Sequence, residues 1–297
     1  MGATRSTRRR ALTALLGLAA VAGGLALAVP RLAPPDWGAA AIAHPYRKPV
    51  TRRPHLAFEL VRFESRGAAL EGWLFRAGSP RGTVVYLHGI GDNRESGIGV
   101  ADRLVPRGFS VLAFDGRAHG LSGGAACSYG YHEREDVRAA LDAIRAREAV
   151  LLGHSLGAAV ALQAAAVDPR VRGVVAASSF SDLRTIVEER AAWLHVPRAY
   201  VARAVARAGE FGSFPPEEAS PVALAPRVRA PVLLLHGVED WRTPPSHSLR
   251  VAAALGGPHE LRLLAGVGHD EILGRDEAWR EIGRFLDRLY PSPAPTP

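Results

Sequence analysis

The sequence of 297 residues contains one cysteine, Cys127, and one lysine, Lys48. A single cysteine excludes a disulfide framework and any zinc site built from several thiolates. No G-x-G-x-x-G motif opens a helix after a predicted strand, and no H-E-x-x-H motif occurs, so the usual patterns for a dinucleotide and for a catalytic zinc are missing. We therefore expect no cofactor and no metal, and we interpret Cys127 as structural.

Most of the chain also lacks a net charge. The formal charge of +8 would by itself favour a nucleic-acid partner. Residues 1–30 carry four arginines and no acid, and residues 31–54 carry five bases and one acid. Residues 55–297 hold 28 bases and 28 acids. Because the excess is confined to the N-terminal fifth of the chain, we expect a neutral body and no nucleic-acid partner.

Charged residues are absent from residues 11–30, which follow Arg8, Arg9 and Arg10. A helix of this length can just cross a hydrocarbon core of ~30 Å. Two interpretations stay open: an uncleaved signal-anchor, or a signal peptide cleaved at the small residues Ala26 and Ala28. A buried core helix is disfavoured because the segment has no polar face. We expect a single-pass cell-membrane protein with an extracytoplasmic body, or else a secreted protein.

Proline marks the segments on either side of the body. Residues 31–54 contain five prolines and the second basic cluster, which predicts an extended stalk with its bases near anionic headgroups. Residues 291–297 are rich in proline and are predicted to be a disordered tail.

Residues 55–290 alternate between strand-like and helix-like patterns. Eight short runs have the apolar or alternating pattern of strands: residues 56–64, 69–76, 83–87, 110–114, 149–152, 171–177, 231–235 and 261–264. Helical spacing of apolar residues occurs in residues 131–147, 156–166 and 279–290. This alternation predicts an α/β domain with a mostly parallel, eight-stranded sheet and helices on both faces.

Residues 178–230 interrupt this alternation. They form about twice the usual length of a crossover, with helical patterns at residues 183–194 and 198–208 and a proline-rich stretch at residues 214–221. Two interpretations stay open: a helical insertion that covers a site, and one longer crossover helix with a loop.

The motif G-x-S-x-G occurs at Gly153, Ser155 and Gly157. It follows a predicted strand and opens a predicted helix, which is the setting of a nucleophile elbow. Glycine suits the two flanking positions because neighbouring side chains would clash across so tight a turn. We predict that Ser155 is a nucleophile; the alternative is a helix N-cap.

A serine nucleophile needs a base and an acid that orients the base. Histidine His269 and the acid Asp240 each follow a predicted strand, which places them at the edge of the sheet where Ser155 lies. Glu239 and Asp270 remain alternatives to Asp240, and a plain loop histidine remains an alternative for His269.

Two backbone amides are expected to form an oxyanion hole. Leu156 follows the nucleophile, and Ile90 lies in the His-Gly-Ile-Gly loop after a strand. The remaining histidines near these motifs are interpreted as structural: His88, His119, His154 and His236.

Five stretches of sequence resemble the α/β-hydrolase superfamily over about residues 55–290. They are residues 87–93 (LHGIGDN), 114–124 (FDGRAHGLSGG), 128–136 (SYGYHERED), 178–183 (SSFSDL) and 236–244 (HGVEDWRTP). The closer likeness is to bacterial membrane-anchored serine hydrolases of the serine aminopeptidase (S33-like) and prolyl-oligopeptidase-related groups. The resemblance implies an α/β-hydrolase fold, an N-terminal anchor and a small lid at about residues 179–230. It also implies the triad Ser155, Asp240 and His269.

Three functions follow as hypotheses. The first is a serine hydrolase of carboxylesterase type, acting on a small acyl ester through an acyl-enzyme. The second is an aminopeptidase acting on short peptides, which needs an acidic anchor for the amine in the lid; the candidates are Glu188, Glu189, Glu210, Glu217 and Glu218. The third is a non-catalytic membrane-tethered binding module. Dehalogenase and epoxide hydrolase chemistry is disfavoured because those relatives have aspartate where this chain has Ser155.

Overall fold

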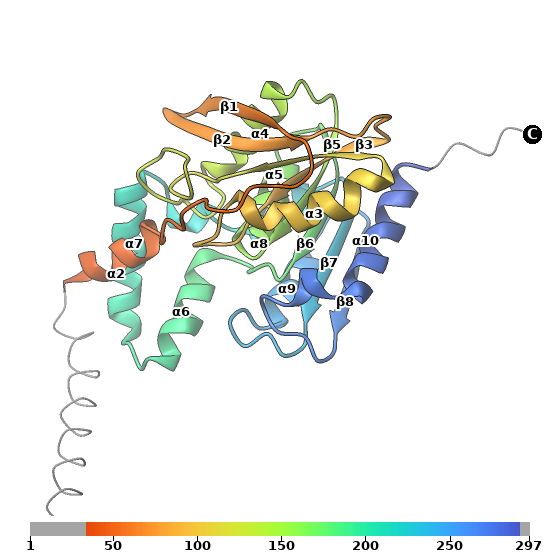
Figure 1. Cartoon of the computed structure of the whole chain (residues 1–297). Coiled ribbons are helices and arrows are strands. Elements are labelled where there is room, and N and C mark those ends of the chain that lie inside the picture. The colour runs from red at the N-terminus through yellow and green to blue at the C-terminus, as the bar shows by residue number, and fades with distance from the viewer. Residues whose placement is uncertain (1–33, 292–297) are drawn as a thin grey trace, which may run out of the picture.

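An open eight-stranded sheet forms the centre of the computed structural model, which describes residues 34–291 (Figure 1). The strand order is β1-β2-β4-β3-β5-β6-β7-β8. β2 pairs antiparallel with both β1 and β4, and the other neighbouring strands are parallel. The strands are β1 (Glu59–Ser65), β2 (Ala68–Phe75), β3 (Gly82–Leu87), β4 (Phe109–Phe114), β5 (Ala149–His154), β6 (Val171–Ala177), β7 (Val232–Gly237) and β8 (His259–Leu264).

Helices cover both faces of this sheet. Val84 and Tyr86 of β3 point into the core under α3 (Gly97–Leu104) and α10 (Asp276–Leu289). Val85 and Leu87 point into the opposite core, under α4 (Glu133–Ala143) and α5 (Leu156–Ala165). A strand buried on both faces has no polar side, which is why the parallel strands read as continuous apolar runs. The predicted fold class is therefore confirmed.

The remaining helices complete the element order. They are α2 (Pro35–Ala43), α6 (Leu183–Trp193), α7 (Arg198–Gly212), α8 (Pro221–Leu224) and α9 (Ser246–Ala254), with short 3-10 helices at Arg94–Ser96, Val105–Arg107, Pro216–Glu218, Ala225–Arg227 and Ile272–Gly274. The patterns had not predicted α2, α3 or α9, which are at most nine residues long. Segments this short contain too few turns for a clear helical period.

Residues 178–230 contain two long helices rather than one crossover helix. In Figure 1, α6 and α7 extend away from the sheet, and α7 lies between α6 and α2. Asp182 begins α6, since its carboxylate accepts a hydrogen bond of 2.8 Å from the Thr185 amide. We name residues 178–230 the helical insertion.

The prediction of an extended stalk at residues 31–54 is wrong for residues 35–43, whereas residues 45–54 contain no helix or strand. Residues 35–43 form α2, whose Asp36 pairs with Arg207 of α7 at 2.8 Å. The Tyr200 hydroxyl donates to the Pro34 carbonyl at 3.2 Å. Ala39, Ile42 and Ala43 are buried in the core, so apolar burial makes this segment part of the domain.

The bases after α2 bind the protein itself. Arg47 donates to the carbonyls of Ser122 and Gly124, each at 2.6 Å, and Lys48 pairs with Asp92 at 2.7 Å. The predicted role of these two side chains at anionic headgroups is therefore corrected: both are engaged by loops of the domain.

The predicted membrane localisation is also contradicted. Among residues 34–291, no helix is both long enough and apolar enough to cross a bilayer. The apolar segment at residues 11–30 and most of the predicted tail, residues 292–297, lie outside the described residues.

A buried ion pair joins the loop after β4 to α4, and its loss should cost stability. Arg117 donates to both carboxylate oxygens of Asp136, at 2.7 and 2.5 Å, and both side chains are buried. We expect Asp136→Ala to lower the free energy of unfolding by about 3–5 kcal/mol, because it leaves a buried guanidinium without its partner. The exposed Asp142 on the same helix pairs with Arg170, and Asp142→Ala should cost less than ~1 kcal/mol. Urea denaturation measures both; equal losses would contradict this ranking.

Candidate active site

Ser155 lies on a strained turn between β5 and α5. Its φ is 53° and its ψ is −114°, a region that residues with a side chain rarely occupy. A Cβ at Gly153 would lie 2.2 Å from the Gly157 carbonyl oxygen, and a Cβ at Gly157 would lie 2.0 Å from that of Leu87. Both positions therefore require glycine. The Ser155 side chain makes no capping hydrogen bond, so the N-cap alternative does not describe it.

His269 lies between Ser155 and Asp240 and contacts both side chains. The distance from His269 Nε2 to Ser155 Oγ is 2.9 Å, and that from His269 Nδ1 to Asp240 Oδ2 is 2.6 Å. All three side chains are buried. The two loops that carry His269 and Asp240 follow β8 and β7, so the parallel register of these strands brings the side chains together.

The alternative acids have other partners. Glu239 accepts a hydrogen bond of 2.9 Å from the Val267 amide, and Asp270 pairs with Arg242 at 2.6 Å. Neither carboxylate hydrogen-bonds His269. Asp240 is thus the acid that orients this histidine.

Asp240 has a second buried histidine beside it, His236 at the end of β7. His236 Nε2 lies 3.3 Å from Asp240 Oδ2 and 2.7 Å from the Thr243 carbonyl oxygen. Burial alone would raise the pKa of Asp240, but hydrogen bonds from His236, His269 and the Thr243 amide outweigh it and hold the pKa well below its usual range. The interpretation of His236 as structural did not include this contact with Asp240. The only signal for it in the sequence is the spacing H-x-x-x-D at the end of a strand.

Two further histidines support the loops around Ser155. His154 Nε2 lies 2.9 Å from the His269 carbonyl oxygen, which ties the histidine loop to the nucleophile turn. His88 accepts a hydrogen bond of 2.9 Å from the Gly116 amide, and its Nδ1 contacts the Gly89 carbonyl at 2.8 Å. Burial lowers the pKa of His88 and of His154, so both act as neutral hydrogen-bonding groups at neutral pH.

The loop after β3 passes close to the nucleophile. A Cβ at Gly89 would lie 3.5 Å from the Ser155 Cβ, and Ile90 lines the same cavity as Ser155. Leu156 is the first residue of α5. Within residues 34–291, neither the Ile90 amide nor the Leu156 amide donates a hydrogen bond to a protein acceptor.

One group of side chains in the described part of the chain has ligand atoms close enough for a metal. His154, His269 and Asp270 place one ligand atom each within 4.8 Å of one another. Two of these side chains already have partners: the ring nitrogens of His269 contact Asp240 and Ser155, and Asp270 pairs with Arg242. We therefore interpret the group as part of the Ser155 site.

A second Ser–His–acid arrangement lies nearby and is closed to solvent. His247 contacts Ser181 Oγ at 2.9 Å through Nδ1 and Glu189 at 2.9 Å through Nε2. The Ser181 amide also donates to His247 Nδ1. Ser181 and His247 are fully buried, and neither lines the cavity that contains Ser155. No sequence pattern predicts this set, in which Glu189 of α6 and His247 of α9 are in contact.

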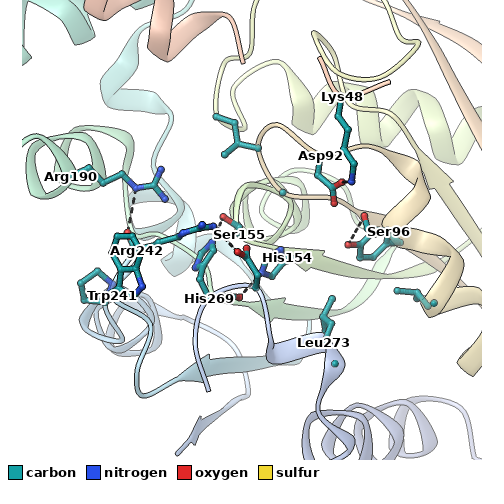
Figure 2. Close-up of a pocket in the computed structure, with 18 of the residues that line it drawn as sticks. Lys48, Asp92, Ser96, His154, Ser155, Arg190, Trp241, Arg242, His269 and Leu273 are labelled. Atoms are coloured by element: carbon teal, nitrogen blue, oxygen red, sulfur yellow. Dashed lines mark hydrogen bonds and ion pairs between the residues drawn. The ribbon is translucent and has the colours of Figure 1, made fainter. Parts of the chain in front are cut away.

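The cavity above Ser155 has a volume of about 1180 Å³ (Figure 2). Its walls come from the helical insertion, the loops after β3, β7 and β8, and α3. Trp193, Trp241 and Trp279, with Leu194 and Leu273, form its large apolar surfaces. A pocket of this size and lining suits an organic molecule with a sizeable apolar part.

Comparison with known proteins agrees with this fold. A family model described as the α/β hydrolase fold matches residues 82–210. The uncharacterized protein Rv2307c of Mycobacterium tuberculosis is 29% identical over 230 residues, which are 74% of this chain and 75% of that protein. The esterase Pf2001 of Pyrococcus furiosus has a TM-score of 0.68 at 24% identity, over 84% of this chain and 98% of the esterase.

A peptidase shares the same fold. The acylaminoacyl peptidase of Pyrococcus horikoshii has a TM-score of 0.61 at 16% identity, over 81% of this chain and 43% of the peptidase. The chain thus has an α/β-hydrolase fold. The narrower resemblance to membrane-anchored, S33-like enzymes stays a prediction.

Proposed function

We propose that this protein is a serine hydrolase that cleaves small acyl esters. The single observation that carries the proposal is the chain of hydrogen bonds from Asp240 through His269 to Ser155 Oγ, with Ser155 lining a large, partly apolar cavity. A buried serine at such a distance from an oriented imidazole has a base for its proton, which is what a hydroxyl needs to act as a nucleophile.

The geometry supports a two-step reaction. His269 Nε2 takes the Ser155 proton while Oγ forms a bond to the substrate's carbonyl carbon. The imidazolium then gives this proton to the departing alcohol as the ester C–O bond breaks, leaving an acyl-enzyme. A water molecule next gives a proton to His269 and attacks the acyl carbon, and Ser155 takes that proton back as the acid leaves.

The amides of Ile90 and Leu156 are proposed to stabilise the negative oxygen that forms in each step. Both donors are otherwise unused, and they lie on the two segments that flank Ser155. Fixed donors aimed at a developing charge contribute about 2.7–4 kcal/mol each in sites of this kind. We also propose that the helical insertion acts as the lid over this site.

The aminopeptidase alternative finds less support. Of the five acids considered as amine anchors, only Glu189 lines the cavity. Glu189 is bound to His247 at 2.9 Å and to Arg250 at 3.1 Å, so its charge is already balanced. A cationic amine would have to displace these partners.

Labelling with a fluorophosphonate probe tests the proposed function. We expect the wild-type protein to be labelled at Ser155, and Ser155→Ala to remain unlabelled, because the probe reacts with an activated serine. Hydrolysis of p-nitrophenyl butyrate compared with an aminoacyl p-nitroanilide then separates an esterase from an aminopeptidase. An unlabelled wild-type protein would favour the non-catalytic binding module.

A further inference from the structure

Four permanently charged cations line the cavity above Ser155: Lys48, Arg103, Arg190 and Arg242. Three of them have a carboxylate partner. Lys48 pairs with Asp92 at 2.7 Å, Arg103 with Asp276 at 3.7 Å, and Arg242 with Asp270 at 2.6 Å. Arg190 has no acid within 4.0 Å among residues 34–291.

The acids that line the cavity are all paired with residues other than Arg190. Asp92 and Asp270 are paired with Lys48 and Arg242, and Glu189 is bound by Arg250 and His247. The cavity therefore contains one guanidinium that no described carboxylate contacts within 4.0 Å, although Asp240 acts on it at longer range. Arg170, which is paired, has a raised pKa. The pKa of Arg190 is lowered, because desolvation and the nearby Arg242 outweigh the opposite effects of Tyr129 and Asp240.

Arg190 extends from α6 of the helical insertion toward the nucleophile. In Figure 2 its side chain lies near Trp241 and Arg242, and all three residues line the cavity that contains Ser155. Its one hydrogen bond runs from Nε to the Arg242 carbonyl at 3.3 Å. This bond engages Nε and leaves both terminal nitrogens, with four N–H donors, without a hydrogen bond to any of residues 34–291.

We propose that Arg190 binds an anionic group of the substrate, so that the preferred substrates are acyl esters carrying a carboxylate, phosphate or sulfate. The inference rests on the proposed esterase function. A planar guanidinium with its terminal donors free binds such oxyanions through two parallel hydrogen bonds. The nearby faces of Trp193 and Trp241 accommodate the apolar part of the same molecule.

Matched esters test the proposal. p-Nitrophenyl hydrogen adipate carries a terminal carboxylate, and its methyl ester has nearly the same length without the charge. We expect the wild-type protein to have a higher kcat/KM for the acid, and the advantage to shrink as salt is raised because the attraction is screened. A second pair, 4-butanoyloxybenzoate and its methyl ester, places the anion on the alcohol side and shows which half of the ester Arg190 contacts.

Arg190→Gln should lower the ratio of the two kcat/KM values, anionic over neutral, by about 10- to 100-fold, the range for a charged hydrogen bond. Arg190→Lys should restore part of the ratio, since the charge is kept and the fork is lost. Arg184→Gln is the matched control, because Arg184 is an exposed arginine of the same helix that does not line the cavity. It should leave the ratio unchanged.

The outcomes separate this proposal from the proposed function. If the wild-type protein hydrolyses both esters equally in each pair, or if Arg190→Gln keeps the wild-type ratio, Arg190 does not recognise an anion although the protein is an esterase. If the wild-type protein hydrolyses no ester and the fluorophosphonate probe does not label it, the proposed function itself is wrong.

Discussion

Ser155→Ala is expected to lower kcat for p-nitrophenyl butyrate by about 10⁴- to 10⁶-fold, the range seen when a triad nucleophile is removed. The physical reason is that alanine leaves no atom to form the acyl-enzyme, although the cavity and the two free amides remain. Initial rates with wild-type and variant protein at equal concentration measure the effect. Circular dichroism establishes that both are folded.

Ser181→Ala is the matched control for this experiment. Ser181 also contacts a histidine that contacts an acid, but it is fully buried and lies outside the cavity. We expect Ser181→Ala to retain activity within a few-fold of wild type. The assignment of Ser155 would be refuted if Ser181→Ala lost activity while Ser155→Ala kept it.

Asp240→Asn should reduce kcat by about 10⁴-fold with little change in fold. The amide carries no charge to stabilise the imidazolium, and its NH₂ group favours the wrong tautomer of His269. His236 and the Thr243 amide would then face an uncharged group where they now meet a carboxylate. Stopped assays at saturating ester measure kcat, and Glu239→Gln is the neighbouring control that should stay near wild type. A larger loss in Glu239→Gln than in Asp240→Asn would assign the triad acid to Glu239.

The pH profile of the wild-type enzyme follows from the same carboxylate. The pKa of Asp240 is held well below its usual range, so lowering the pH to about 4 leaves it ionised. A fall in kcat/KM between neutral pH and pH 4 therefore does not report proton uptake by Asp240. Asp240→Asn should lower kcat/KM at every pH between neutral pH and about pH 4.

Local sequence predicted the nucleophile turn well. Gly153 and Gly157 occupy positions where a Cβ would meet a carbonyl oxygen, and the apolar strand before them and the alanine-rich helix after them are local features. The strand β6 was predicted with its observed bounds, Val171–Ala177. Each of these features depends on residues that are close together in the chain, so a single sequence is enough to predict them.

The region before β1 was predicted poorly. Its prolines and bases indicated an extended, solvated stalk, yet residues 35–43 form a helix against α7, and Arg47 and Lys48 bind loops of the domain. The partners of Asp36, Arg47 and Lys48 lie 44 to 171 positions further along the chain. No local pattern reports whether a distant surface will satisfy a base or cover an apolar helix.

The sequence by itself determined the α/β alternation, the strained turn at Ser155 and the order of the candidate acid and base. These depend on hydrophobic period and on the space that glycine leaves. Only the tertiary structure decided that Asp240, rather than Glu239 or Asp270, contacts His269. It also placed His236 next to Asp240. Among the four cations that line the cavity, Arg190 is the one with no carboxylate partner within 4.0 Å among the described residues. Each of these depends on which side chains the register of the sheet and the position of the helical insertion bring within hydrogen-bonding distance.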